Sequence, residues 1–327
     1  MLLLLLPLWI DTINRVIQNV IAENKKSGIR LDAALLMLFP TSSRSFIRQA
    51  ISNGSILVNS RKAFKGLKLK GSEILEIKEL LEENDNTIAP NNSIEVNNIY
   101  TDEQLLAFDK PSGMKVQPLS CTETDTLMNG VVSRWPECAS SGDLPLMGGA
   151  LHRIDTGTSG LVLIARDKTT YENIRQQFSQ HTVKKTYLAL VEGKVEESGV
   201  IETDLVHDDS CRFCRMVDIR KARCPRNEKP MHAITSYKPI FTTKTECEDR
   251  TLLEVTIKTG VTHQIRAQLA SLSMHIINDT LYGAFAVEGI KGHFLHSLNA
   301  TFVHPSTGVE TTISTALPNW ARPNWAY

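Results

Sequence analysis

The sequence has few cysteines and no excess of charge of either sign. Its six cysteines are scattered over 327 residues and form no disulfide framework, so we expect a reducing compartment, the cytoplasm. There is no excess charge, because 36 Lys and Arg balance 36 Asp and Glu. No internal repeat is found, and the ordinary composition argues against a disordered or collagen-like chain. A chain of this length can bury the core of one large domain and one small one.

The sequence also lacks an apolar run long enough to cross a membrane. The run MLLLLLPLWI at 1–10 falls short of the roughly 20 apolar residues that a spanning helix needs. It has neither the basic start nor the small-residue cleavage site of a signal peptide. We therefore expect a packed or frayed N-terminal extension over 1–28 and no membrane partner. A targeting segment and an over-extended start are the alternatives.

The balanced charge is unevenly distributed along the chain. Residues 60–72 contain five basic side chains and no acid, and residues 211–229 contain seven basic side chains against two acids. Acidic residues cluster instead at 78–86. Local basic segments of this kind favour a polyanionic partner even where the net charge is zero.

A small compact unit is predicted over residues 29–78. Apolar residues at 31, 34, 35 and 38 have helical spacing, and TSSRSFIRQAISNG (41–54) begins with capping residues and ends in Asn-Gly. Short strands at SILVN and EILEI follow. Residues 79–98 are acidic, rich in Asn and contain Pro, which is typical of a linker.

Two helices followed by a small sheet resemble the S4 RNA-binding domain, and two arginines one turn apart strengthen the resemblance. It implies that this unit contacts RNA through four basic side chains: Arg44, Arg48, Lys62 and Lys65. The alternative is a generic two-helix unit with solvated arginines.

From residue 99 to 327, short β-like runs alternate irregularly with predicted helices at 167–180 and 262–274. This irregularity predicts an α+β fold with a mixed, mainly antiparallel sheet. LHRIDTGTSGLVLIARDK (151–168) places a polar loop before the apolar strand Leu161–Ala165. Asp155 in that loop is a candidate nucleophile or base, since a carboxylate is ionised at neutral pH. Alternatively, it only caps its own turn.

HRIDTGTSG (152–160) resembles the His-Arg-Leu-Asp signature of the RluA family of pseudouridine synthases, with Ile154 in place of Leu. Other motifs of the family are matched in order by LLAFDKPSGMKVQP (105–118), KKTYLALVEGKV (184–195), TGVTHQIRAQLA (259–270), NDTLYG (278–283) and LHSLNATFVHPSTGVE (295–310). Val261 stands where many members have Arg, and Ala267-Gln268 replace a usual Val-His pair.

The resemblance implies a pseudouridine synthase fold and an isomerase that converts uridine in RNA to pseudouridine without cofactor or metal. Asp155 would be the catalytic carboxylate, and Arg266 would pair with it. Tyr187 would stack on the base, with help in removing the C5 proton as a second role. Arg153 and Thr158 would contact the RNA. We expect a monomer that acts on large-subunit ribosomal RNA, with transfer RNA as the alternative substrate. A catalytically silent RNA-binding assembly factor is the second hypothesis.

Four cysteines, Cys211, Cys214, Cys224 and Cys247, raise the question of a zinc site. Structural zinc usually takes four ligands in two close pairs, and the second pair is broken here, so we expect a basic RNA-facing loop with incidental thiols. His263 is expected to be a hydrogen-bonding residue rather than a metal ligand.

Overall fold

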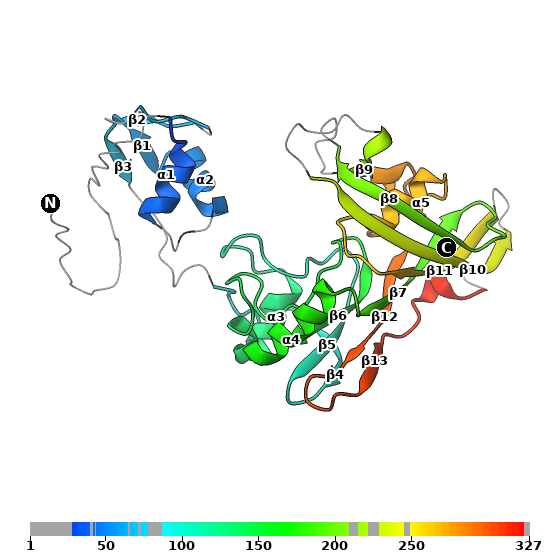
Figure 1. Cartoon of the computed structure of the whole chain (residues 1–327). Helices are drawn as coiled ribbons and strands as arrows, with labels where there is room; N and C mark the ends of the chain where they lie inside the picture. The colour runs from blue at the N-terminus through cyan, green and yellow to red at the C-terminus, as the bar shows by residue number, and fades with distance from the viewer. Residues whose placement is uncertain are drawn as a thin grey trace. The chain divides into compact units, whose positions relative to one another are not determined.

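The structure, a computed structural model, describes residues 28–39, 42, 44–64, 66–70, 73–77, 87–208, 215–221, 229–244 and 249–323. The predicted N-terminal extension, apart from Gly28, lies outside these residues, as does the linker between 78 and 86. The chain divides into a small unit, up to Thr87, and a large unit that begins at Ile88, with Leu119–Cys121 grouped with the small unit (Figure 1). Each unit has its own hydrophobic core. Within the described residues, no helix is both long and apolar enough to span a bilayer.

The small unit consists of two helices and a three-stranded antiparallel sheet in the order β2-β1-β3. Its elements are α1 (Leu31–Leu38), α2 (Arg44–Asn53), β1 (Ile56–Val58), β2 (Arg61–Lys62) and β3 (Leu75–Ile77). The apolar faces predicted for the helices form the core, where Leu31, Leu35, Ile47 and Ile51 are at most 1% exposed. The chain leaves α2 at Gly54, which has a φ of 82°, a conformation that glycine adopts without strain.

The large unit is built on a ten-stranded sheet in the order β4-β5-β6-β12-β7-β11-β10-β8-β9, with β13 paired to β12. The strands are β4 (Asn97–Thr101), β5 (Leu105–Lys110), β6 (Ser159–Ala165), β7 (Lys184–Glu192), β8 (Gly199–His207), β9 (Met216–Asp218), β10 (Met231–Lys244), β11 (Asp249–Ile257), β12 (Leu295–Val303) and β13 (Glu310–Ser314). β6 and β12 are parallel, and the other pairs among the described strands are antiparallel. The predicted α+β fold with a mixed, mainly antiparallel sheet is therefore confirmed.

Three α-helices accompany this sheet in the described part of the chain. They are α3 (Leu127–Arg134), α4 (Lys168–Ser179) and α5 (Gln264–Ser271), with short 3₁₀ turns at Pro136–Ala139, Ile219–Lys221, Thr280–Tyr282 and Asn319–Ala321. α4 begins after Asp167, whose side chain accepts a hydrogen bond from the Thr170 N–H. Asp167 therefore caps the helix predicted over 167–180.

The large unit takes in part of the segment assigned to the linker. Ile88 is 3% exposed and packs in a core with Leu106 and Phe108, and β4 already begins at Asn97. The apolar run Leu161–Ala165 is fully buried, because β6 lies inside the sheet between β5 and β12. This strand anchors the polar loop before it.

Candidate active site

Asp155 lies in the loop that leads into β6, and one of its two carboxylate oxygens is held by an arginine. Oδ2 accepts a hydrogen bond from Nη1 of Arg266 at 2.8 Å, and the Asp155 side chain is 26% exposed. No described residue donates a hydrogen bond to Oδ1. The loop therefore presents an oriented carboxylate with one oxygen still available to a ligand.

Arg266, on α5, is shared between Asp155 and a second carboxylate. Its Nε and Nη2 donate to the two oxygens of Asp279 at 2.7 and 2.8 Å, and its guanidinium lies 5.1 Å from the ring centre of Tyr282. Burial alone would lower the pKa of Arg266, but the hydrogen bonds and charge of Asp279, and then Asp155, raise it. The site therefore contains a permanent, oriented cation.

Asp279 is 2% exposed and was not among the predicted site residues. Its position in the NDTLYG motif was a signal that could have identified it. Without a partner, a buried carboxylate is strongly disfavoured, so the bidentate contact to Arg266 explains why Asp279 is tolerated in the core.

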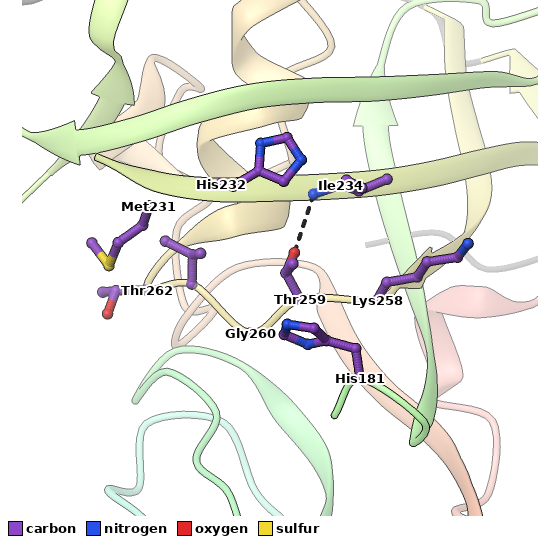
Figure 2. Close-up of a pocket in the computed structure, with 9 residues that line it drawn as sticks. His181, Met231, His232, Ile234, Lys258, Thr259, Gly260 and Thr262 are labelled. Atoms are coloured by element: carbon purple, nitrogen blue, oxygen red, sulfur yellow. Dashed lines mark hydrogen bonds between the residues drawn. The ribbon is translucent and has the colours of Figure 1, made fainter. Parts of the chain in front are cut away.

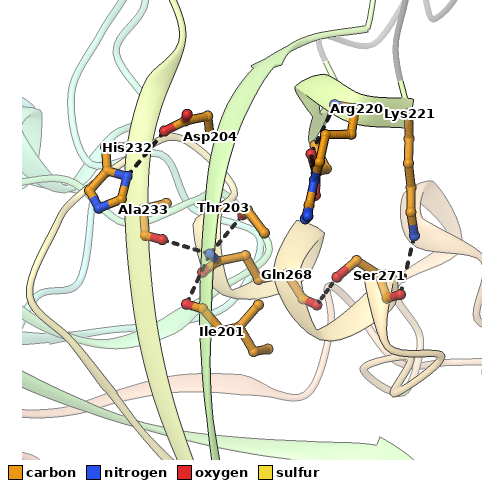
Figure 3. Close-up of polar contacts among 10 residues, drawn as sticks. Ile201, Thr203, Asp204, Arg220, Lys221, His232, Ala233, Gln268 and Ser271 are labelled. Carbon is orange, nitrogen blue, oxygen red and sulfur yellow. Dashed lines mark hydrogen bonds and ion pairs between the residues drawn. The ribbon is translucent and has the colours of Figure 1, made fainter.

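Buried amides hold α5 against the sheet, and Figure 3 shows the contacts of one of them, Gln268. Nε2 of Gln268 donates to the hydroxyl of Thr203 at 2.9 Å and to the carbonyl of Ala233 at 2.9 Å. Gln264, one turn earlier, is also buried. Because residues two positions before and after Arg266 point away from it on a helix, these amides fix the face that Arg266 presents to Asp155.

Tyr187, on β7, is 6% exposed and pairs in register with Ser297 of β12. Burial raises the pKa of its hydroxyl to about 12, and the charge of Asp155 adds to this, while a hydrogen bond with Ser297 opposes it. The hydroxyl therefore stays protonated at neutral pH. This favours stacking or hydrogen-bond donation over proton abstraction by Tyr187.

Thr158 does not face the solvent. It is 2% exposed, and a 2.8 Å hydrogen bond joins its hydroxyl to Nε2 of His293. Its N–H donates to the carbonyl of Asp155 at 3.0 Å. The side chain turns inward and shapes the loop, and the RNA contact of Thr158 stays a prediction.

Lys110 supports the same loop from β5. It is fully buried, and its ammonium donates to the carbonyls of Met114 at 2.7 Å and Thr156 at 3.4 Å. Burial lowers its pKa to about 8, although the charges of Asp155 and Asp109 oppose the shift. Lys110 belongs to the motif at 105–118, but it was not predicted as a site residue.

The histidines near the loop act as hydrogen-bonding residues. Nε2 of His152 accepts from the Leu163 N–H at 3.1 Å, and burial lowers its pKa to about 3, so the ring is neutral. Nδ1 of His263 lies 3.1 Å from the Tyr282 hydroxyl, as a hydrogen-bonding histidine should. Its Nε2 is 3.8 Å from Oδ2 of Asp155. Arg153, two positions before Asp155 in the sequence, is exposed.

The basic residues predicted to bind RNA in the small unit lie on its surface where they are described. Arg44, Arg48 and Lys62 are exposed, and Nε of Arg48 lies 3.6 Å from Oδ2 of Asp32. Lys65 lies outside the described residues, as do the four cysteines considered for zinc. Among the residues that the structure does describe, no group of three or more metal-ligating side chains is found.

Comparisons with known proteins identify the class. The family profile of RNA pseudouridylate synthases matches residues 104–271. The fold resembles that of human RNA pseudouridylate synthase domain containing 1, with a TM-score of 0.57 and 20% identity over 70% of this chain and 86% of that one.

Curated relatives extend the match to nearly the whole chain. The ribosomal large subunit pseudouridine synthase D of Nitrosomonas europaea is 31% identical over 90% of this chain and 82% of that protein. The protein of the same name from Xanthomonas campestris is 28% identical over 94% and 91%. The chain belongs to the RNA pseudouridylate synthase family, and the resemblance to its RluA branch is confirmed. It is thus an isomerase.

Proposed function

We propose that this chain converts uridines of large-subunit ribosomal RNA to pseudouridine, with Asp155 as the catalytic carboxylate. The main support is the pair formed by Asp155 and the buried Arg266, which leaves Oδ1 of Asp155 without a hydrogen bond from any described residue. The choice of RNA is supported by relatives named ribosomal large subunit pseudouridine synthase D.

The reaction exchanges one bond for another within the same nucleotide. The N1–C1′ bond breaks, the uracil turns, C5 bonds to C1′, the proton on C5 leaves and N1 gains one. Nothing is oxidised and no group comes from outside, so neither a cofactor nor a metal is required. Asp155 attacks the sugar or the base, or abstracts a proton, through Oδ1, while Arg266 orients the carboxylate through its hydrogen bond to Oδ2.

Other residues bind and expose the nucleotide. A base in folded RNA must leave its stack before Asp155 can reach it, which costs a few kcal/mol. We assign Tyr187 to stacking on the displaced base and the exposed Arg153 to the RNA strand beside it. These contacts offset the unstacking.

The small unit, residues 29–78, is proposed to be an S4-type RNA-binding domain. Its two-helix and three-strand architecture and its exposed Arg44, Arg48 and Lys62 support this assignment. Contacts between such side chains and phosphates would add affinity without adding to the chemical step. We propose that the protein acts as a monomer in the cytoplasm.

The first experiment measures tritium release from large-subunit ribosomal RNA labelled at C5 of uridine. We expect release with the wild type and a loss of roughly a thousandfold or more with Asp155→Asn, which keeps the shape of the side chain but removes its charge. The exposed Asp125→Asn serves as the control. RNA binding without any release by the wild type would instead support an assembly factor. If a deletion strain lost pseudouridine only in transfer RNA, the choice of ribosomal RNA would be wrong.

A further inference from the structure

A pocket of about 420 Å³ lies in the large unit beside the segment that leads into α5 (Figure 2). Residues 258–262 form one side of it, and His181, His232 and Ile234 contribute to the others. Thr262 precedes His263, whose Nε2 is 3.8 Å from Oδ2 of Asp155. The pocket therefore adjoins the candidate active site. Its lining includes none of the residues that contact Asp155.

Several polar groups on the side formed by residues 258–262 are already hydrogen bonded within the protein. The Val261 N–H and the Thr259 hydroxyl both donate to Oε1 of the buried Gln264, at 3.1 and 2.8 Å. The Ile234 N–H donates to the Thr259 hydroxyl at 3.1 Å, the dashed line in Figure 2. The surface open to a ligand in this pocket includes the half-buried apolar side chains of Val261 and Ile234. A preformed, largely apolar surface of this kind suits the flat face of a nucleobase.

Two lysines give this side of the pocket a positive charge. Lys258 lines it and is exposed, and Lys185 is buried, with its Nζ 3.4 Å from the point where a Cβ on Gly260 would stand. Neither lysine forms an ion pair with a carboxylate in the described part of the chain. Nζ of Lys185 donates to the Thr259 carbonyl at 2.8 Å.

The cation beneath Gly260 is energetically unfavourable as it stands. Burial lowers the pKa of Lys185 to about 8, since no neighbouring acid compensates the loss of hydration. An anion above Gly260 would stabilise the charged form of Lys185 together with Lys258. His232, which also lines the pocket, lies 3.3 Å from Glu202 and 3.1 Å from Asp204. Glu202 pairs in register with Ile234, so the two acids place negative charge beside His232 and Ile234.

We propose that this pocket binds a nucleotide of the RNA next to the target uridine, with its base against Val261 and Ile234 and its phosphate between Lys258 and Gly260. This inference rests on the proposed function, because it takes the RNA substrate as the ligand. The pocket then helps to hold the strand from which the target uridine is extruded.

Removing the charge at the rim tests the phosphate contact. Lys258→Met in the full chain should raise KM for large-subunit ribosomal RNA roughly fivefold with little change in kcat, and the salt dependence of log Kd should fall by about one. Lys244→Met is the matched control, since Lys244 is an exposed lysine at the far end of β10, ten residues or roughly 30 Å from Ile234. An unchanged KM and salt dependence in Lys258→Met, or an equal effect of Lys244→Met, would overturn the proposal.

A binding measurement separates this proposal from the proposed function. The probe is a short oligouridylate, titrated against Asp155→Asn alone and in combination with Lys258→Met. Weaker binding by the double variant supports the pocket even if the wild type never releases tritium. Equal binding by both chains, with normal tritium release by the wild type, overturns the pocket and leaves the proposed function intact.

Replacing single phosphates of the oligouridylate by neutral methylphosphonates locates the contact. At one position the replacement should weaken binding to Asp155→Asn and have no further effect on the double variant. If every replacement acts equally on both chains, Lys258 contacts no particular phosphate and the proposal is wrong.

Discussion

Arg266 divides three hydrogen bonds between two carboxylates, two to Asp279 and one to Asp155. The bidentate contact lies in the buried part of the site, where Asp279 is 2% exposed, whereas the Asp155 side chain is 26% exposed. The two hydrogen bonds to Asp279 orient the guanidinium, and Asp279 itself does not face the ligand. This division leaves one oxygen of Asp155 without a hydrogen bond from any described residue, so that oxygen is open to a ligand.

Asp279→Asn should therefore affect catalysis without changing RNA binding. An amide accepts at one atom only, so the guanidinium loses one hydrogen bond and its orientation. We expect kcat to fall roughly tenfold to a hundredfold at a nearly constant KM. The free energy of unfolding should fall by about 2 to 4 kcal/mol. Single-turnover tritium release and urea unfolding measure the two effects, with the exposed Asp143→Asn as control. A lower stability at unchanged kcat would show that Asp279 is structural only.

Sequence reasoning identified the residues that meet at the site but not the direction of every side chain. The contact between Asp155 and Arg266 that the family motifs implied is present, while the catalytic roles stay predictions. The inward orientation of Thr158 could not be predicted, because it depends on His293, which lies 135 positions later. Asp279 was missed for a similar reason. Its partner Arg266 becomes apparent only when α5 and the following turn are packed together.

At the scale of elements, α5 is short for local reasons. The helix predicted over 262–274 spans only Gln264–Ser271, because His263 and Ser273 have φ values of 54° and 62°, outside the helical range. Such a short helix has little stability of its own. Gln268 and Gln264 therefore determine its position through the hydrogen bonds they make to β8, β10 and the segment before α5.

Gln268 stands where the RluA motif usually has His, and its replacement tests how α5 is held. Gln268→Ala leaves the Ala233 carbonyl and the Thr203 hydroxyl without this donor, so the free energy of unfolding should fall by about 2 to 3 kcal/mol. A shifted helix should also lower kcat. Gln268→His should recover part of both losses, because an imidazole supplies one donor and one acceptor. Denaturant unfolding and tritium release check this. Equal losses in the two variants would contradict a role for these hydrogen bonds.

At the scale of the molecule, the strand order brings distant motifs together. β6 and β12 pair in parallel with Ser159 opposite His296, which joins the loop of Asp155 to a motif 137 positions later. Short apolar, β-like runs predicted some of these strands, such as the run Leu161–Ala165 in β6. They did not predict the order of pairing, because an apolar run such as Leu161–Ala165 can pair with any neighbour that buries it.

The same assembly buries histidines in neutral form, and this predicts loss of stability in acid. His293 and His296 are 9% and 2% exposed, and burial lowers the pKa of each from 6.5 to about 4. Since the unfolded chain binds these protons at a higher pH than the folded chain does, stability is fully present above pH 6.5 and is lost as the pH falls toward 4. Each imidazole contributes about 1 kcal/mol per pH unit across that window.

Urea unfolding of the full chain from about pH 7 to about pH 5 measures this slope. His296 is the informative position, because its two nitrogens bond to the hydroxyls of Ser159 and Thr315 at 2.8 and 2.7 Å. Gln keeps a donor and an acceptor but does not titrate, so His296→Gln should reduce the slope by about 1 kcal/mol per pH unit. The exposed His181→Gln should leave it unchanged. If both variants retained the wild-type slope, the acid sensitivity would have to arise from groups other than the histidine that joins the Asp155 loop to β12.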